Sequence, residues 1–261
     1  MGDATPQFLT VGSGAARREI AVIRQEGRTP GLFWLSGFKS DMTGTKAAAL
    51  AERAASTGQA VTRMDYSGHG QSGGRFEEGT ISRWLEEARA VFDTDAPGER
   101  IVVGSSMGGW LALLLTLAHV AEVGLERSRI RGLVLIAPAT DFTEELMWRQ
   151  RFDDTIREEI LRTGRYARPS AYGDGPYVIT RELIEDGRRH LLLGRALQLG
   201  CPVSILQGRR DPDVPWTHAL RLVESLPQDD VRLTLVPDGD HRLSRPQDIS
   251  LLLDLIAGIS S

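Results

Sequence analysis

Residues 100–113 read Arg-Ile-Val-Val-Gly-Ser-Ser-Met-Gly-Gly-Trp-Leu-Ala-Leu, and this stretch decides the fold. Ile101–Val103 is a short β-branched run typical of a buried strand, and the apolar run from Trp110 has helical character. Between them, residues 104–108 match the pattern G-x-S-x-G, whose strand–turn–helix setting predicts a nucleophile elbow. Glycines let the strand and the helix approach each other around a strained serine. We therefore expect the hydroxyl of Ser106, the central residue, to stand above the carboxyl edge of a sheet.

Composition indicates one globular domain spanning residues 1–261. A chain of 261 residues with 41% hydrophobic content can bury a large core. The net charge of −4 argues against a nucleic-acid partner, and the single cysteine, Cys201, excludes an intrachain disulfide. No signal-peptide pattern is visible, and the longest apolar stretch, Trp110–Ala118, is too short to span a membrane. We expect a cytoplasmic protein without membrane insertion; its oligomeric state is not readable.

Strand-like and helix-like segments alternate along most of the chain, which predicts a mostly parallel, doubly wound α/β sheet. Two early strands should pair in antiparallel fashion. Residues 139–195, rich in Arg, Glu and Asp, interrupt the alternation with helical pieces around 142–163 and 180–193. We interpret this insertion as a lid over the carboxyl edge of the sheet, where ligands bind in such folds. The expected strands, about eight, cover 8–11, 19–24, 32–35, 59–65, 101–103, 132–137, 202–206 and 231–236.

A serine hydroxyl is a weak nucleophile at neutral pH, so Ser106 needs a base that is itself held by an acid. After the strand at 202–206, the pattern Gly-x-x-Asp-x-x-Val-Pro points to Asp211 as the acid. Asp213 is the competitor, interpreted as a capping or rim residue. His241 follows the strand at 231–236 and supplies the base. The predicted triad is Ser106, Asp211 and His241.

The other four histidines are weaker candidates for the base. His119 and His218 fall in expected helices, and His190 falls in the insertion. His69 borders the site but precedes the serine in the chain, whereas acid and base follow the serine in this architecture.

Acyl transfer also needs two preorganised N–H groups that hold the oxyanion. Met107, directly after the nucleophile, supplies one from the start of the elbow helix. Phe38 follows Gly37 in the loop after the strand at 32–35 and is expected to supply the second. Its side chain should line the acyl pocket.

No motif suggests a cofactor or a metal ion. No H-x-x-x-H motif, C-x-x-C motif or carboxylate cluster in the sequence suggests a metal ion. The glycine-rich loop Asp65–Gly74 lacks a Walker lysine, so we interpret it as structural, with Asp and Ser satisfying backbone donors.

The chain has only two lysines, and both flank the expected oxyanion loop. Lys46 is interpreted as a structural partner of a carboxylate, with Asp41 the candidate. Lys39 is either an ordinary solvated lysine or a group that attracts an anionic leaving group, such as a glucuronate or coenzyme A, at the pocket mouth.

Together these segments resemble the α/β-hydrolase superfamily over nearly the whole chain. The nearest resemblance is to the branch of palmitoyl-protein thioesterases that also cleave acyl glucuronides. One departure is Ser36-Gly37-Phe38, which replaces the His-Gly pair frequent before the oxyanion loop. The resemblance is carried by residues 44–47, 65–68, 104–110, 214–216 and 240–242.

We therefore expect a cofactor-free serine hydrolase that cleaves carboxylic esters or thioesters through an acyl-enzyme on Ser106. Its substrate would be a small or acylated molecule. A peptidase or carbon–carbon bond hydrolase using the same triad is an alternative, as is a ligand receptor on a hydrolase scaffold. Dehalogenase and epoxide-hydrolase chemistry is disfavoured because those relatives carry aspartate at the position of Ser106.

Overall fold

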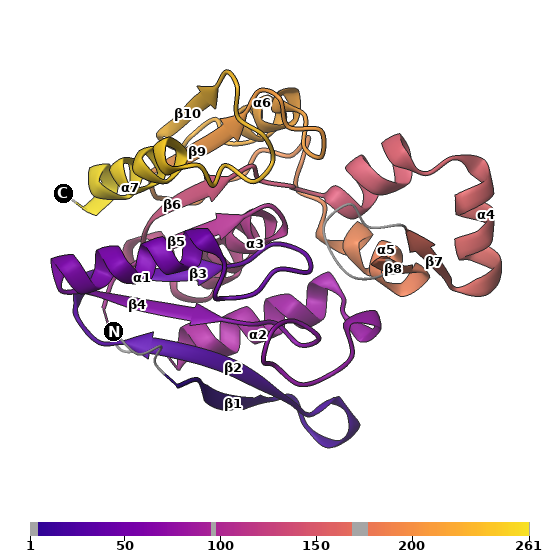
Figure 1. Cartoon of the computed structure of the whole chain (residues 1–261), viewed down its shortest axis with the longest axis horizontal. Coiled ribbons are helices and arrows are strands. Elements are labelled where there is room, and N and C mark those ends of the chain that lie inside the picture. Colours follow the sequence, from indigo (N-terminus) through magenta and orange to yellow (C-terminus); the bar gives the residue numbers. More distant parts are fainter. Residues whose placement is uncertain (1–4, 95–97, 169–176, 261) are drawn as a thin grey trace.

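A computed structural model describes residues 5–94, 98–168 and 177–260. Its centre is an eight-stranded sheet in the order β1-β2-β4-β3-β5-β6-β9-β10 (Figure 1). β1 pairs with β2, and β2 with β4, in antiparallel fashion, while the other neighbours are parallel. The predicted mostly parallel sheet is confirmed. The strands are β1 Gln7–Val11, β2 Arg18–Gln25, β3 Arg28–Leu35, β4 Gln59–Met64, β5 Arg100–Ser105, β6 Ile130–Ile136, β9 Val203–Gly208 and β10 Val231–Val236.

Helices cover both faces of the sheet, as a doubly wound fold requires. On one face lie α1 (Thr45–Thr57) and α7 (Pro246–Ser260), which bury side chains against β3, β5 and β6. The other face is covered by α2 (Ile81–Asp93), α3 (Met107–Val123) and α6 (Trp216–Glu224). The first half of α3 is apolar all round because the sheet, α2 and the insertion enclose it.

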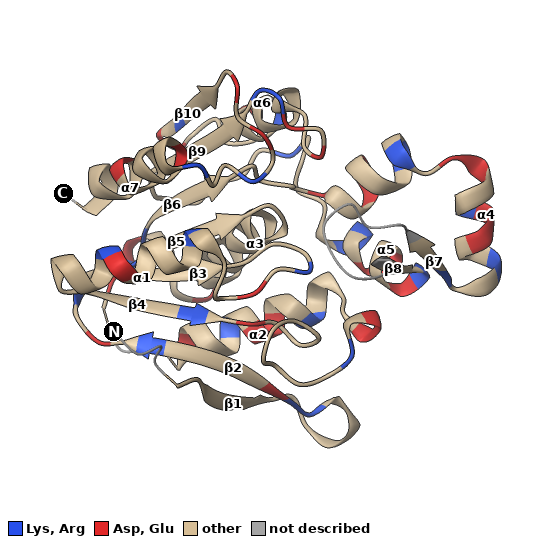
Figure 2. Cartoon of the chain, in the orientation of Figure 1, with Lys and Arg blue, Asp and Glu red and all other residues tan. Residues whose placement is uncertain are grey.

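The predicted insertion lies between β6 and β9 and stands beyond the carboxyl ends of the strands, at the right of Figure 1. Acidic and basic residues follow one another closely along it (Figure 2). The central part of the predicted lid, residues 169–176, lies outside the described residues. The insertion contains the π-helix Thr143–Arg151, α4 Asp154–Thr163, the antiparallel strands β7 Arg165–Arg168 and β8 Tyr177–Thr180, and α5 Arg181–Gly187.

The sequence predicted helices here but neither their break nor the β7–β8 ribbon. The first helical piece divides at Asp153, whose carboxylate accepts a hydrogen bond from the Ile156 amide and caps α4. The second piece ends earlier than expected, because a short 3-10 turn, Arg188–His190, follows α5.

A single buried carboxylate ties the two ends of the insertion together. Asp141, at its start, has a φ of 57° and is 1% exposed. Its side chain accepts hydrogen bonds from the amides of Leu192, at 2.9 and 3.0 Å, and Leu193, at 2.8 Å. The two ends of the insertion therefore lie close together where the chain leaves and re-enters the sheet.

Among the described helices, none combines the length and apolarity that crossing a bilayer demands.

This buried carboxylate predicts a pH dependence of stability. Burial raises the pKa of Asp141 from 3.8 to about 6, against the lowering effect of the Leu193 and Leu192 amides. The folded state therefore binds a proton more tightly than the unfolded state, and this group's contribution to stability falls as pH rises from about 4 to 6. Asp141→Asn removes the titration. Urea unfolding at pH 4 and pH 7 should show the free energy of unfolding of the wild type falling by about 1–3 kcal/mol relative to the variant. Parallel pH curves for the two proteins would contradict the assignment.

Candidate active site

Ser106 occupies a strained turn between β5 and α3, as the motif predicts. Its φ of 55° and ψ of −118° lie outside the regions that ordinary side chains adopt, a conformation that costs about 1–3 kcal/mol. Backbone bonds hold the strain in place: the Ser106 amide donates to the Ile136 carbonyl at 2.8 Å. The Ser106 carbonyl accepts from the amides of Gly109 at 2.9 Å and Ala139 at 3.0 Å.

The motif glycines are required by close backbone approaches. A Cβ on Gly104 would lie 2.3 Å from the Gly108 carbonyl oxygen, and a Cβ on Gly108 would lie 2.1 Å from the Leu35 carbonyl oxygen. No side chain fits at either position. The end of β3 therefore packs directly against the start of α3.

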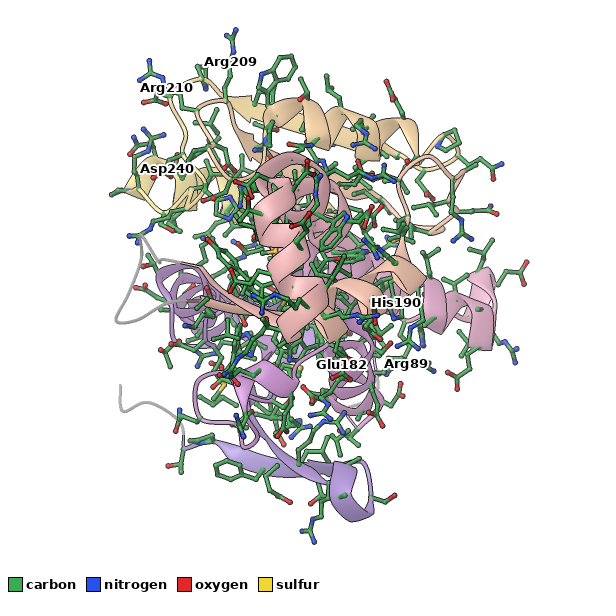
Figure 3. All side chains as sticks on the ribbon, turned by 90° about the vertical axis from the view of Figure 1, so that its right-hand side faces the viewer. Arg89, Glu182, His190, Arg209, Arg210 and Asp240 are labelled. Carbon is green, nitrogen blue, oxygen red and sulfur yellow. The ribbon has the colours of Figure 1, made fainter. Side chains whose placement is uncertain are left out.

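Two further loops reach this edge from β9 and β10, which are parallel neighbours. They touch each other closely, since a Cβ on Gly208 would lie 2.5 Å from the Asp240 carbonyl oxygen. Figure 3 shows Arg209, Arg210 and Asp240 of these loops at one corner of the molecule. The residues that follow each strand are thus held at a fixed separation.

The structure brings the three residues of the predicted triad together. His241 Nδ1 lies 2.8 Å from Asp211 Oδ2, and His241 Nε2 lies 3.1 Å from Ser106 Oγ. The Asp211 side chain is fully buried, and its Oδ1 accepts hydrogen bonds of 2.8 Å from the amides of Asp213 and Val214. Both carboxylate oxygens are thereby held, which orients the imidazole toward the serine.

The two residues predicted for the oxyanion hole, Phe38 and Met107, line the same cavity as Ser106. Met107 is the first residue of α3, where backbone N–H groups lack an intrahelical acceptor. Residues 37–40 form a tight turn, closed by a 3.0 Å bond from the Ser40 amide to the Gly37 carbonyl. A Cβ on Gly37 would lie 3.3 Å from Ser106 Cβ, so this turn passes beside the serine.

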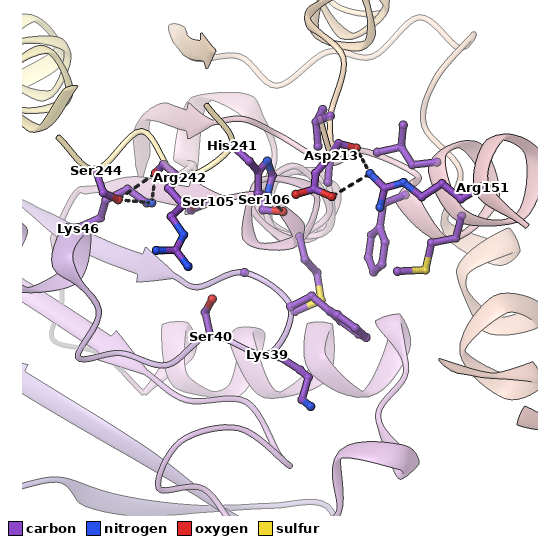
Figure 4. Close-up of a pocket in the computed structure, with 18 of the residues that line it drawn as sticks. Lys39, Ser40, Lys46, Ser105, Ser106, Arg151, Asp213, His241, Arg242 and Ser244 are labelled. Atoms are coloured by element: carbon purple, nitrogen blue, oxygen red, sulfur yellow. Dashed lines mark hydrogen bonds and ion pairs between the residues drawn. The ribbon is translucent and has the colours of Figure 1, made fainter. Parts of the chain in front are cut away.

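A cavity of about 460 Å³ opens above Ser106 (Figure 4), within the range of small-molecule sites. One part of its wall is apolar and comes partly from the insertion; another part is polar and basic. Phe38 lines it, as predicted, and its ring also contacts Phe76, Trp84 and Phe142. The apolar lining residues are Phe38, Met107, Ala139, Phe142, Leu146, Met147, Ile179 and Val214, and the polar part comprises Lys39, Ser40, Thr45, Lys46, Arg242 and Ser244.

His69, the strongest rival base, is a packing residue. Its ring is 4% exposed and contacts the aromatic side chains of Tyr66, Phe76 and Trp84. Burial lowers its pKa to about 4. Its Nδ1 lies 3.1 Å from the Ser67 carbonyl oxygen.

The remaining histidines contact other parts of the chain. His119 Nε2 accepts a 3.2 Å bond from the Arg129 amide. His218 Nε2 lies 2.7 Å from the Thr140 carbonyl oxygen. His190 lies far from the β9 and β10 loops in Figure 3 and contacts Ser82 Oγ at 2.7 Å.

Asp213 has a larger part than the predicted cap or rim. It lines the cavity, and the Arg151 guanidinium donates to its carbonyl oxygen at 2.5 Å and to its Oδ1 at 3.1 Å. Sequence reasoning missed Arg151, because nothing in the local sequence distinguishes it from the other arginines of the insertion.

The predicted pairing of Lys46 with Asp41 is wrong. The Asp41 carboxylate accepts hydrogen bonds from the amide and the hydroxyl of Thr43, at 2.8 and 2.6 Å, within its own turn. Lys46 Nζ donates to the Arg242 carbonyl at 2.5 Å and to Ser244 Oγ at 3.2 Å (Figure 4). Burial lowers its pKa to about 8. Lys46 therefore supports the loop that follows His241.

Lys39 lines the cavity and places its ammonium 5.4 Å from the centre of the Phe76 ring. In Figure 4 its side chain points away from Ser106. Attraction of an anionic leaving group by Lys39 stays a prediction.

Among the residues that the structure describes, one group has metal-type ligand atoms within 4.8 Å of one another: Asp211, Asp213 and His241. Its donors are already engaged, because Asp211 Oδ2 holds His241 Nδ1. The donor set therefore fits a hydrogen-bonded relay better than a metal site. In the Asp65–Gly74 loop, the Asp65 carboxylate accepts hydrogen bonds from the amides of Met42 and Gln71, so it satisfies backbone donors as the sequence predicts.

Comparison with known proteins places this geometry among hydrolases. Residues 32–172, more than half of the chain, match the Hydrolase_4 family, described as serine aminopeptidase, S33. The mouse mitochondrial palmitoyl-protein thioesterase ABHD10 is 34% identical over 247 residues, covering 93% of this chain and 80% of the relative. The cytoplasmic location expected from the sequence stays a prediction.

Solved structures agree in fold. A putative hydrolase from Agrobacterium vitis S4 superposes with a TM-score of 0.92 at 48% identity and 98% coverage of both chains. Mouse α/β hydrolase domain-containing protein 10 superposes with a TM-score of 0.85 at 32% identity, again over 98% of both chains.

The lysine contacts predict unequal effects of two matched variants. Lys46→Met deletes the donor to the loop after His241 and should lower the free energy of unfolding by about 1–2 kcal/mol. Lys39→Met removes an ammonium that lies 5.4 Å from the centre of the half-buried Phe76 ring, a contact worth about 0.5–1 kcal/mol, and should cost less than Lys46→Met. Urea unfolding of both variants measures the difference. Equal losses would show that Lys46 does not support this loop.

Proposed function

The chain belongs to the Hydrolase_4 family of α/β hydrolases, and we propose that it cleaves carboxylic esters or thioesters through an acyl-enzyme on Ser106. One observation carries the proposal: a continuous hydrogen-bond relay runs from Asp211 through His241 to Ser106 Oγ at the cavity wall. In this proposal the turn at Ser106 is a nucleophile elbow, and Ser106, His241 and Asp211 form a catalytic triad.

The relay supports a two-step reaction. Ser106 Oγ attacks the acyl carbon while His241 Nε2 accepts its proton, and Asp211 stabilises the imidazolium that forms. The N–H groups of Phe38 and Met107 hold the oxyanion. His241 then donates the proton to the departing alkoxide or thiolate, leaving the acyl group on Ser106. A water molecule, deprotonated by His241, then attacks the acyl carbon. The bond between that carbon and Ser106 Oγ breaks, the carboxylic acid leaves, and His241 returns the proton to Ser106 Oγ.

Acyl substrates also fit the walls of the cavity. The apolar part accommodates an acyl chain, and the insertion contributes Phe142, Leu146, Met147 and Ile179 to it. We propose that residues 1–261 act as one domain in which residues 139–195 form a lid that sets the acyl specificity. The polar part then faces the alcohol or thiol. Its basic side chains favour a neutral or anionic leaving group over a cationic one.

The family description makes an aminopeptidase the second candidate. Such an enzyme must bind a free ammonium group, which calls for an acidic side chain near the serine. Asp213 is the acidic residue among the described lining residues, and it already pairs with Arg151. The charge of the cavity therefore favours ester and thioester substrates over peptides with a free amino terminus.

Ser106→Ala tests the nucleophile directly. The wild type should react covalently with a fluorophosphonate probe and hydrolyse p-nitrophenyl esters and acyl-coenzyme A thioesters. The variant should lose both, because the attacking oxygen is gone. Ser105→Ala, one position away, is the matched control and should keep both. Labelling that survives in Ser106→Ala would reject the proposal, and a wild type without any turnover would favour a receptor.

Phe38→Pro tests the oxyanion donor. The change deletes a backbone N–H and should lower kcat by about 10²–10³-fold. Phe38→Leu keeps the N–H and alters only the ring, so its kcat should stay within about tenfold of the wild type. Steady-state kinetics on one ester measures both variants. A loss under tenfold in Phe38→Pro would assign the donor to another residue.

A further inference from the structure

We propose that Arg151 is a positioning residue that acts from the insertion: it holds the loop bearing Asp211, and through that loop it aligns His241 with Ser106. The inference rests on the proposed function of these three residues. It assigns to the insertion a part in the chemistry beyond walling the acyl pocket.

Arg151 reaches the loop with two hydrogen bonds. It is the last residue of the π-helix Thr143–Arg151, and its guanidinium extends across the cavity wall toward Asp213 (Figure 4). It donates to the Asp213 carbonyl at 2.5 Å and to Asp213 Oδ1 at 3.1 Å. The two side chains are 26% and 24% exposed, so water screens this pair less than a pair on the open surface.

Asp213 in turn is bound to the carboxylate of Asp211. The amides of Asp213 and Val214 both donate to Asp211 Oδ1 at 2.8 Å, and the opposite oxygen holds His241. The carbonyl that Arg151 holds and the Val214 amide belong to the same planar peptide group. A shift of that peptide group therefore moves one of the two amides that hold the Asp211 carboxylate. The rate of an enzymatic reaction falls when its catalytic groups are displaced by a few tenths of an ångström.

The sheet supports the same loop from its other side. Gln207, buried in β9, donates from Nε2 to the Val214 carbonyl at 3.0 Å and to Asp211 Oδ2 at 3.3 Å. Gln207 belongs to the rigid sheet, whereas Arg151 belongs to the insertion. Alignment of the acid thus depends on where the insertion sits.

The same π-helix places Leu146 and Met147 in the apolar wall of the cavity. An acyl chain bound in the cavity would pack against the same π-helix that carries Arg151. Occupancy of the acyl pocket and alignment of the acid are therefore linked through one short helix.

Arg149 provides a matched control. It lies on the same helix two residues earlier, and its guanidinium pairs with Glu144 at 3.0 Å and Glu145 at 2.9 Å. Neither Glu144 nor Glu145 lines the cavity or contacts the Asp211 loop in the described contacts. Arg149→Gln removes the same charge from the same helix without touching this loop.

The test compares wild type, Arg151→Gln, Arg151→Lys and Arg149→Gln by the rate of Ser106 labelling with a fluorophosphonate between pH 5 and 9. Arg151→Gln should lower the plateau rate about tenfold. It should also move the midpoint of the pH–rate profile to lower pH, because an imidazole whose carboxylate is displaced loses its proton more readily. Arg151→Lys, which keeps the charge but replaces the planar guanidinium with an ammonium on a shorter side chain, should lose about two- to fivefold with the same direction of shift. Arg149→Gln should stay within twofold of the wild type.

The direction of the midpoint separates positioning from simple charge. Removing a cation near the site raises the midpoint, since the protonated imidazole is then less disfavoured. An upward shift, an Arg151→Gln rate within twofold of the wild type, or an equal loss in Arg149→Gln would overturn the proposal. If Arg151→Gln does not fold, the Lys variant decides by the same criteria. Labelling that persists in Ser106→Ala would overturn the proposed function, and the role of Arg151 with it; labelling confined to Ser106 but insensitive to Arg151 would overturn the role of Arg151 alone.

Discussion

The structure depends on a steric constraint: there is no room for a side chain where β5 turns into α3. Gly104 meets the Gly108 carbonyl, and Gly108 meets the Leu35 carbonyl, at distances that a Cβ cannot tolerate. The turn between them must therefore be short and strained, and Ser106 takes a positive φ. The same contact presses the end of β3 against the start of α3. Ser106 and the candidate oxyanion donors thus come together through backbone packing, before any side-chain interaction is considered.

The sheet and the insertion contribute differently to the site. Parallel strands end at one edge, so the loops after β5, β9 and β10 meet there in fixed register. The insertion adds the apolar wall and Arg151, and the Asp141 carboxylate ties its two ends to each other. The proposed reaction centre is rigid because the strands position it. The lining of the cavity is shared between the loops that follow the strands and the insertion.

Sequence reasoning failed where an interaction depends on the reach of a long side chain. The sequence suggests Asp41, five residues away, as the partner of Lys46, but the Asp41 carboxylate accepts hydrogen bonds from Thr43 within its own turn. Lys46 instead crosses to Arg242 and Ser244 at the far end of the chain. The β7–β8 ribbon escapes prediction for a different reason. Each strand is only four residues long, which is too short to show a clear alternation of apolar and polar residues, and the two strands pair with each other.

The sequence by itself determined the order of the strands and helices of the main sheet, the strained turn at Ser106, and the candidates Asp211, His241, Phe38 and Met107. These features follow from short-range rules: apolar periodicity, the conformations open to glycine, and the position of a loop after a strand. Only the tertiary structure decided that Arg151 holds Asp213, that Lys46 supports the loop after His241, and that His69 is packed among aromatic rings. The sequence does not show which arginine or lysine will contact which group, because a long charged side chain selects its partner by distance in space, and only folding sets that distance.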